Sequence, residues 1–200
     1  MLGLLRFRPA AMTAEAGIDL VEIDQAPLLA RPYYLAGDPG PIVAALAHVP
    51  ELLEAALPFI GVALGPSAMN ARSKELAIVR TSALLECRYC VEAHTPVARD
   101  AGLAAEEVLA LRAESGLDEV FSDPGERALL AWVDALALGR GPVAAELRDA
   151  VATWFGTPFL VELTVLVGAT MMLNRFCTAL DLPTSPDTLR RLEAEGLTWP

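Results

Sequence analysis

Hydrophobic residues recur along most of this chain at intervals of three or four, which is the spacing of one face of an α-helix. The first such segment begins at Ile42, after a loop over 27–41 that is rich in proline and glycine. Pro50 is expected to start the second helix, and Gly65-Pro66 to end it. Further helices are predicted over 74–85, 87–101, 104–115, 126–138, 143–155 and 160–180. No segment alternates with period two for long enough to predict a strand, so we expect an all-α bundle.

Local signals define the ends of the central helices and the limits of the domain. Ser73 is predicted to cap the helix over 74–85, and Gly102 to stop the one over 87–101. We therefore divide the chain into an N-terminal extension and loop (1–41), a helical domain (42–182) and a C-terminal tail (183–200).

Composition restricts the class of protein. The chain has 200 residues, of which 54% are hydrophobic and 20% charged, as expected for a folded domain. Its net charge of -11 argues against binding to nucleic acid or to an anionic membrane surface. No secretory signal is recognised at the N-terminus, and the apolar run over 159–173 contains Glu162, which favours a buried helix over a membrane span. Three cysteines do not fit a secreted disulfide scaffold, so a cytoplasmic protein is predicted.

The most informative chemistry lies in the segment Cys87-Arg88-Tyr89-Cys90-Val91-Glu92-Ala93-His94. On a helix, Cys90 and His94 are one turn apart and share a face, and Cys87 lies one turn before Cys90. A carboxylate, Glu75, precedes the pair by twelve residues. Cysteine redox chemistry requires a thiolate, a neighbouring base and a second thiol within reach, so this cluster predicts a redox-active pair.

Three other interpretations of the pair are open. Cys87 and Cys90 could be two small buried hydrophobic residues. They could bind zinc with His94 as a third ligand, although the fourth ligand is not apparent, since His48 is remote and Cys177 is placed only by the fold. A thioredoxin fold would require a strand before the pair, where the pattern predicts a helix.

The remaining polar and aromatic residues are expected to have structural roles. Taken alone, Glu75 is typical of a surface acid in a first helical turn, and Glu86 and Glu92 of solvated acids. Tyr89 is expected to pack, with its hydroxyl placed so that it could donate a proton. The others are expected in packing, capping or core positions: His48, Trp132, Trp154, Phe176 and Cys177.

A faint internal repeat has an offset of 87 residues. Glu75-Leu76 matches Glu162-Leu163, and Arg88-Tyr89-Cys90 matches Arg175-Phe176-Cys177. If the repeat is real, the fold has two related helical halves, and only the first keeps the chemistry.

Glu75, Cys87-Arg88-Tyr89-Cys90 and His94 together resemble the motif of the alkylhydroperoxidase D-like group within the carboxymuconolactone decarboxylase superfamily. The stretch from Arg72 to Arg80, the stop at Gly102 and the helix around Asn174-Arg175 fit as well, so the resemblance covers about residues 42–182. It implies an all-helical bundle with an internal pseudo-repeat. It also implies a homo-oligomer, commonly a trimer or hexamer, with a dimer as the alternative.

The resemblance further implies a thiol-dependent peroxidase or related disulfide reductase that needs no cofactor. Cys90 would attack a hydroperoxide, Cys87 would resolve the sulfenic acid to a disulfide, and Glu75 with His94 would relay protons. A dithiol or lipoyl-type partner would reduce the disulfide. Tyr89 departs from alkylhydroperoxidase D itself, which has histidine there, so its role is auxiliary. The alternatives are a non-enzymatic redox-sensing or structural oligomer and a zinc-binding protein.

Overall fold

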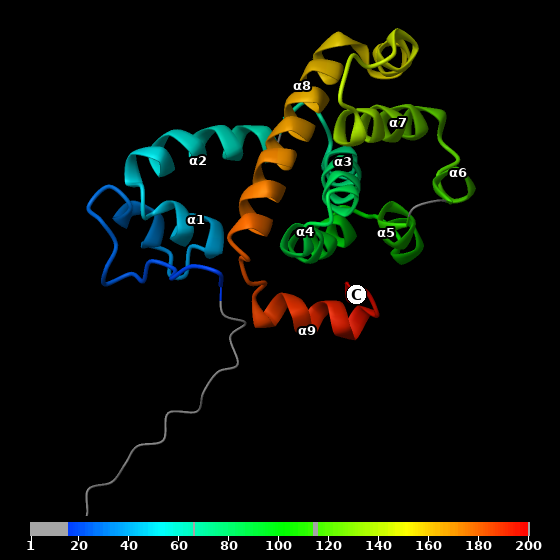
Figure 1. Ribbon diagram of the computed structural model, residues 1–200. Coiled ribbons are helices and arrows are strands. Elements are labelled where there is room, and N and C mark those ends of the chain that lie inside the picture. The colour runs from blue at the N-terminus through cyan, green and yellow to red at the C-terminus, as the bar shows by residue number, and fades with distance from the viewer. Residues whose placement is uncertain (1–15, 66, 114–115, 200) are drawn as a thin grey trace, which may run out of the picture.

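The computed structural model describes residues 16–65, 67–113 and 116–199, and within these ranges it contains helices and no strand (Figure 1). The all-α prediction is therefore confirmed. The elements are η1 (Arg31–Tyr34), α1 (Pro41–Leu46), α2 (Pro50–Leu64), α3 (Ala71–Leu84), α4 (Arg88–Asp100), α5 (Ala105–Arg112), α6 (Leu117–Val120), α7 (Pro124–Leu138), α8 (Ala145–Ala179) and α9 (Pro186–Glu195). The sequence pattern did not predict the short α6, and η1 lies within the expected loop over 27–41. Helix α9 lies in the segment that the sequence analysis gives as the C-terminal tail.

Helix α3 lies at the centre of the bundle and contacts α4, α5, α7 and α8 (Figure 1). Every residue from Ser73 to Ala83 is buried, on all faces of the helix. Leu76 and Val79 are fully buried in the main hydrophobic core. Burial of each such side chain stabilises the folded state by about 1.5–3 kcal/mol relative to an exposed one. Helix α3 is therefore the central helix of the core.

The N-terminus of α3 is capped by Asn70 rather than by Ser73, so the predicted cap is wrong. The backbone at Asn70 is extended, and its side chain accepts a hydrogen bond of 2.8 Å from the backbone N–H of Ser73. A capping residue needs this non-helical backbone conformation. Ser73 already lies inside the helix and is the residue whose N–H is capped.

A buried lysine in α3 joins three helices. The ammonium group of Lys74 donates to the carbonyl oxygens of Ala63 (3.0 Å) and Gly65 (2.6 Å), at the C-terminal end of α2. It also pairs with Glu162 of α8 at 3.1 Å. A cation at a helix C-terminus satisfies carbonyl groups that have no partner within the helix, so α2 is tied to the core by its end.

Helices α3 and α8 end in the same kind of turn. The backbone N–H of Cys87 donates to the carbonyl of Ser82, and that of Leu182 to the carbonyl of Cys177, both at 3.0 Å. This six-residue bond is the mark of a Schellman ending. The two turns lie 95 residues apart in the sequence. The structural repeat of α3–α4 in α8–α9 therefore has an offset of 95 residues at the turn, whereas the sequence match has an offset of 87.

The conformation inside the two turns is also shared. Glu86 and Asp181 have positive φ angles of 53° and 48°, the left-handed conformation that a C′ residue adopts. The helices that follow, α4 and α9, both end next to a glycine with positive φ, Gly102 and Gly196. Only the first of these pairs carries cysteines at the start of its second helix.

Helix α8 is bent at Gly156, whose φ of 82° and ψ of 167° are not helical. The bend separates the two helices predicted over 143–155 and 160–180, so they form one element with two arms. The residues of α8 that are buried lie on one side of the helix and include Leu163, Leu166, Val167, Leu173 and Cys177.

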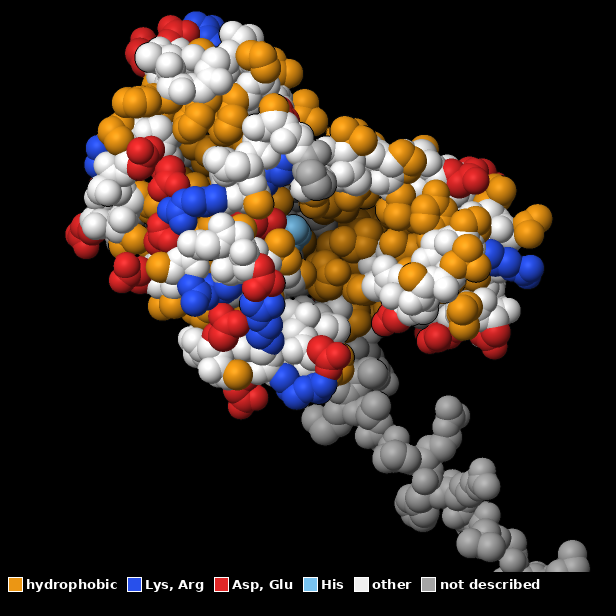
Figure 2. Space-filling model, turned by 180° about the vertical axis from the view of Figure 1, so that it is seen from behind, with side chains coloured by type: hydrophobic (Ala, Val, Ile, Leu, Met, Phe, Trp, Pro, Cys, Tyr) orange, Lys and Arg blue, Asp and Glu red, His pale blue; other side chains and the backbone are white. Residues whose placement is uncertain are grey.

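The other side of α8 is apolar and exposed. Trp154, Val161, Val165 and Met172 are between 44% and 58% exposed, so the prediction that Trp154 belongs to the core is wrong. By length and composition alone, α8 is a helix that could cross a membrane, a test that helices of water-soluble cores also pass. Figure 2, a view from behind, shows hydrophobic side chains gathered in a hollow of the molecular surface.

The segments on either side of the helical domain pack on it. Residues 16–30 run along α1 and the end of α8, with Gly17 N–H donating to Leu180 and Val21 N–H to Ala44. The ring nitrogen Nε2 of His48 lies 2.7 Å from the carbonyl oxygen of Asp19, so His48 holds this segment in place. The rest of the predicted N-terminal extension, residues 1–15, lies outside the described residues.

At the other end of the chain, α9 lies along α4 (Figure 1). Arg191 forms a forked ion pair with Asp100, with N–O distances of 2.6 and 3.0 Å. Arg99 pairs with Glu195 at 3.2 Å. The tail thus forms a helix that covers one side of the thiol-bearing helix.

Candidate active site

Both thiols of the Cys-x-x-Cys segment lie at the N-terminus of α4. The turn through Glu86 reverses the chain directly after α3, so that Cys87 is the N-cap of α4 and Cys90 lies in its first turn. The free N–H groups of a first helical turn and the positive end of the helix dipole favour a negative charge there. The turn therefore places two nucleophiles where a thiolate is stabilised.

The two sulfur atoms are close to each other. Sγ of Cys87 lies 2.8 Å from Sγ of Cys90, and both side chains are buried. A disulfide bond has a length of about 2.05 Å, so only a small movement separates this arrangement from a closed bond. The structure thus brings together the predicted redox pair.

Hydrogen bonds, burial and charge give the two thiols different pKa values. The pKa of the Cys87 thiol is lowered to about 3 by the thiols of Cys177 and Cys90 first, and further by the backbone N–H of Cys90 and the hydroxyl of Thr178. The hydrogen bond from Cys177 lowers the pKa of the Cys90 thiol, but the hydrogen bond with Cys87, burial and the charge on Cys87 together outweigh it and raise that pKa to about 12. Cys87 is therefore the thiolate of the resting pair.

Cys177 of α8 packs against both members of the pair in one buried cluster. It lies in the last turn of α8, where carbonyl groups and the negative end of the helix dipole disfavour a thiolate. Its pKa is raised by the neighbouring sulfurs and by burial. Burial of Cys177 confirms the sequence prediction, but its place beside the pair was not predicted.

Glu75 and His94 are brought together, as the sequence analysis expected of a relay. Nδ1 of His94 lies 3.1 Å from one carboxylate oxygen of Glu75 and 3.4 Å from the other. Glu75 is buried at 6% exposure, so the interpretation as a surface acid is wrong for this fold. His94 is one helical turn after Cys90 on α4, and its side chain is about a quarter exposed. Within the described part of the chain, no hydrogen bond links His94 to either thiol in this arrangement.

Asn174 connects the second helical pair to the site. Its amide donates to the hydroxyl of Ser82 at 3.1 Å and contributes to the environment of the Cys90 thiol. Asn174 is fully buried, and its carbonyl oxygen has no protein partner. A buried polar atom without a hydrogen-bond partner destabilises the folded state. The Asn174 oxygen is therefore an unused hydrogen-bond acceptor next to the thiols.

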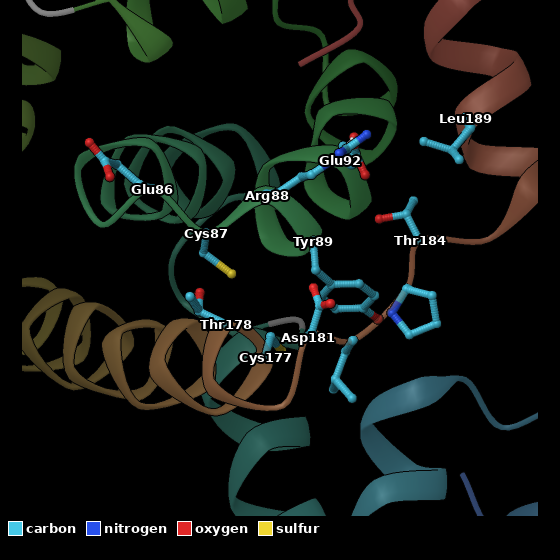
Figure 3. Close-up of a pocket in the computed structure, with 12 residues that line it drawn as sticks. Glu86, Cys87, Arg88, Tyr89, Glu92, Cys177, Thr178, Asp181, Thr184 and Leu189 are labelled. Carbon is cyan, nitrogen blue, oxygen red and sulfur yellow. Dashed lines mark hydrogen bonds and ion pairs between the residues drawn. The ribbon is translucent and has the colours of Figure 1, made fainter. Parts of the chain in front are cut away.

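A pocket of about 200 Å³ opens on the side of Cys87 (Figure 3). The thiols of Cys87 and Cys177 border it, whereas Cys90 does not. The other residues around it come from the turn before α4, from α4, from the last turn of α8, from the α8–α9 connection and from α9: Glu86, Arg88, Tyr89, Glu92, Thr178, Asp181, Leu182, Pro183, Thr184 and Leu189.

The polar residues next to the pair differ in part from expectation. Glu92 is buried and pairs with Arg88 at 2.9 Å, so its assignment as a solvated acid is wrong, whereas Glu86 is exposed as predicted. Burial first, and then the nearby sulfurs, raise the pKa of the Tyr89 phenol, which lies beside the pocket. The Tyr89 phenol therefore stays protonated, and its side chain forms part of the pocket wall.

The described residues include no group of three His, Cys, Asp or Glu side chains arranged so that it could hold a metal ion. The three thiols are grouped around one another, and the histidine next to them faces the carboxylate of Glu75. The arrangement is suited to proton transfer and to thiol–disulfide exchange.

Part of this chain is similar to known proteins. Residues 50–135 match the carboxymuconolactone decarboxylase family. The YnjA protein of Escherichia coli (strain K12) is 28% identical over 110 residues, which are 55% of this chain and 59% of that protein. The chain thus matches less than two thirds of the length of this relative.

Solved structures share the fold at low identity. One is the alkylhydroperoxidase AhpD core of a peroxidase-related protein from Ralstonia eutropha JMP134, with a TM-score of 0.76 and 18% identity over 86% of this chain and 94% of that one. Another is the debrominase Bmp8, with a TM-score of 0.69 and 17% identity over 87% of this chain and 95% of that one. The fold and site define a helical protein with a buried thiol pair. Residues 50–135 are similar to the carboxymuconolactone decarboxylase family, and the chain has the alkylhydroperoxidase D-like fold.

Sequence reasoning missed the contribution of α8 to the site. Asn174, Cys177 and Thr178 lie more than eighty residues after the pair, and no spacing rule connects them to it. The one available signal was the match of Arg175-Phe176-Cys177 to the first thiol segment, which drew attention to Cys177 but in a register that does not predict contact.

Proposed function

We propose that this chain is a cofactor-free thiol oxidoreductase that reduces hydroperoxides through the pair Cys87 and Cys90. The observation that carries the proposal is the pair of sulfur atoms 2.8 Å apart at a helix N-terminus. Such a pair can accept an oxidising equivalent and store it as an internal disulfide.

In the first step, Cys90 is the attacking thiol and His94 the base. Glu75 holds Nδ1 of His94, which leaves Nε2 to take the proton of Cys90, one helical turn away. The sulfur attacks the terminal oxygen of the hydroperoxide, the O–O bond breaks, and the alkoxide takes a proton to leave as the alcohol. Cys90 is then a sulfenic acid.

In the second step, Cys87 resolves the sulfenic acid. Its low pKa supplies a thiolate next to the oxidised sulfur, and attack releases hydroxide, which leaves as water. The disulfide is then open to a dithiol from the pocket on the Cys87 side. Attack of a dithiol or lipoyl-type reductant on Cys87 releases Cys90 as the leaving thiol and returns the enzyme to its reduced form.

The proposal is tested by steady-state turnover of an organic hydroperoxide with dihydrolipoamide as reductant, comparing wild type with Cys90→Ser. We expect the variant to turn over at the uncatalysed rate. Equal rates for the two proteins would show that the pair is not a peroxidase site. A reversible disulfide without any turnover in the wild type would favour a redox-sensing or structural role.

A second candidate activity is reductive dehalogenation, because the debrominase Bmp8 has the same fold. An apolar recess of about 530 Å³ is bordered by Ala45 and Phe176, which also pack against the thiol cluster. Release of bromide from a brominated pyrrole in the presence of the dithiol would support this activity over peroxide reduction.

We further propose a homo-oligomer whose contacts cover the exposed apolar sides of α2 and α8. Leu52, Phe59 and Val62 of α2 and Val161 and Val165 of α8 are exposed, and exposed apolar surface of this kind is typical of subunit contacts. Sedimentation equilibrium would show a trimer or hexamer, and replacement of Val62 and Val165 by aspartate would dissociate it.

A reducing compartment such as the cytoplasm suits a thiol pair of this kind.

A further inference from the structure

A third thiol lies against the redox pair. Cys177 is 1% exposed and belongs to the same buried cluster as Cys87 and Cys90, but it comes from α8, on the opposite wall of the site. Figure 3 shows the side chain of Cys87 extending from α4 toward the end of α8, where Cys177 and Thr178 lie. The chain has three cysteines, and all three meet at this point.

We propose that Cys177 is a third redox thiol of this site, able to close a disulfide with Cys90 in place of Cys87, and with Cys87 in place of Cys90. The proposal rests on the peroxidase function proposed above in so far as a hydroperoxide is the oxidant. It assigns Cys177 as a second resolving thiol. When Cys87 is not available to react with an oxidised Cys90, or Cys90 with an oxidised Cys87, Cys177 forms the disulfide and so protects the oxidised sulfur from further oxidation.

The chemistry balances without any further reactant. A hydroperoxide converts one thiol of the pair to a sulfenic acid and leaves as the alcohol. The Cys177 thiol then attacks that sulfur, the S–O bond breaks, and the hydroxyl group leaves as water with the proton that Cys177 gives up. One hydroperoxide is thus reduced and two thiols are oxidised to one disulfide.

The position of Cys177 explains why it would act second. It lies at the C-terminal end of α8, where a thiolate is disfavoured, whereas Cys87 and Cys90 lie at the favourable N-terminal end of α4. Cys177 therefore keeps its proton at rest and becomes a nucleophile only when an electrophilic sulfur is in contact with it.

The test uses the full chain as Cys87→Ser, fully reduced and then treated with one equivalent of cumene hydroperoxide. Free thiols are alkylated, and the protein is digested and mapped by mass spectrometry. We expect a loss of about two mass units assigned to a Cys90–Cys177 bond in most molecules. Cys87→Ser combined with Cys177→Ser is the matched control, in which Cys90 should be trapped as sulfenic or sulfinic acid instead.

A second oxidant separates this proposal from the proposed peroxidase function. Diamide oxidises neighbouring thiols without a peroxide, so it should form Cys90–Cys177 in Cys87→Ser, and Cys87–Cys177 in Cys90→Ser, even if neither wild type nor variant reacts with hydroperoxide. Far-ultraviolet circular dichroism of each variant checks that it is folded. A folded Cys87→Ser protein in which Cys177 stays fully alkylated after diamide, or in which only bonds between different chains form, would overturn the proposal.

Discussion

The pairs α3–α4 and α8–α9 have the same construction and different contents. Each is a long helix, a turn with one acidic residue in the left-handed conformation, and a second helix that ends at a glycine. In the first pair, the residue after the turn is Cys87, whereas in the second pair it is the buried Leu182. The repeated scaffold supplies a helix N-terminus twice, but only one copy has a thiol there.

The second pair contributes to the site in another way. Its first helix supplies Asn174, Cys177 and Thr178, which face the thiols of the first pair. The position of a thiol along its helix therefore decides its chemistry. Cys87 and Cys90, at the start of α4, are placed to react, and Cys177, at the end of α8, is placed to support them.

The largest effect is expected for the thiols of the first pair, in a single reaction with hydroperoxide. Cys90→Ser should lose peroxide consumption by about 10³-fold or more, because it removes the proposed nucleophile, one helical turn before His94 on α4. Cys87→Ser should still react once, and stopped-flow mixing followed by sulfenic-acid trapping measures both. The opposite result, with Cys87 as the attacking sulfur, would exchange the two roles.

The next largest effect is expected for Glu75, the carboxylate of the pair α3–α4 that contacts a histidine. Glu75→Gln should lower turnover by about 10²-fold, because His94 loses the group that orients its ring and balances its charge. Glu86→Gln is the matched control, since this exposed acid adjoins Cys87 but does not contact His94. A similar loss in both variants would show that Glu75 acts through overall charge and not as part of a relay.

The pH dependence of stability tests whether the thiolate belongs to the first pair. The pKa of Cys87 is lowered from 9.0 to about 3 in the folded chain, so its thiolate stabilises the fold fully above about pH 9 and loses this contribution as the pH falls toward 3. The free energy of unfolding of wild type, measured in urea, should therefore exceed that of Cys87→Ser by a margin that narrows from about pH 9 to about pH 5. A margin that is constant with pH would place the thiolate elsewhere.

The smallest effect tests the support given by the second pair. Thr178→Val keeps the shape of the side chain but removes a hydroxyl that helps to lower the pKa of Cys87, so that pKa should rise by about one unit or less. The pKa is measured by the pH dependence of thiolate absorbance at about 240 nm in the reduced protein. Thr153→Val is the control, because the Thr153 hydroxyl bonds to its own helix, at the carbonyl of Asp149. Equal pKa values for Cys87 in Thr178→Val and wild type would remove this hydroxyl from the account of thiolate stabilisation.

Much of the fold could be predicted from the sequence because apolar spacing and helix-ending residues are local signals. The boundaries of α2, α4 and α7 agree with the predicted ranges within a few residues. Two local predictions failed. Ser73 lies inside α3, since Asn70 three residues earlier takes the capping position, and Glu92 is buried, although its partner Arg88, one turn earlier on the same helix, is exposed.

The helical fold and the placing of Cys87, Cys90 and His94 on successive turns follow from the sequence alone, because those relations depend only on helix geometry. The motif also pointed to Glu75, through resemblance. Three further relations depend on how the helices pack: Glu75 contacts His94, Cys177 completes a three-thiol cluster, and α8 keeps an exposed apolar side. The reason is that contacts between helices depend on how the turns and the bend at Gly156 orient them, and spacing along one helix does not contain that information.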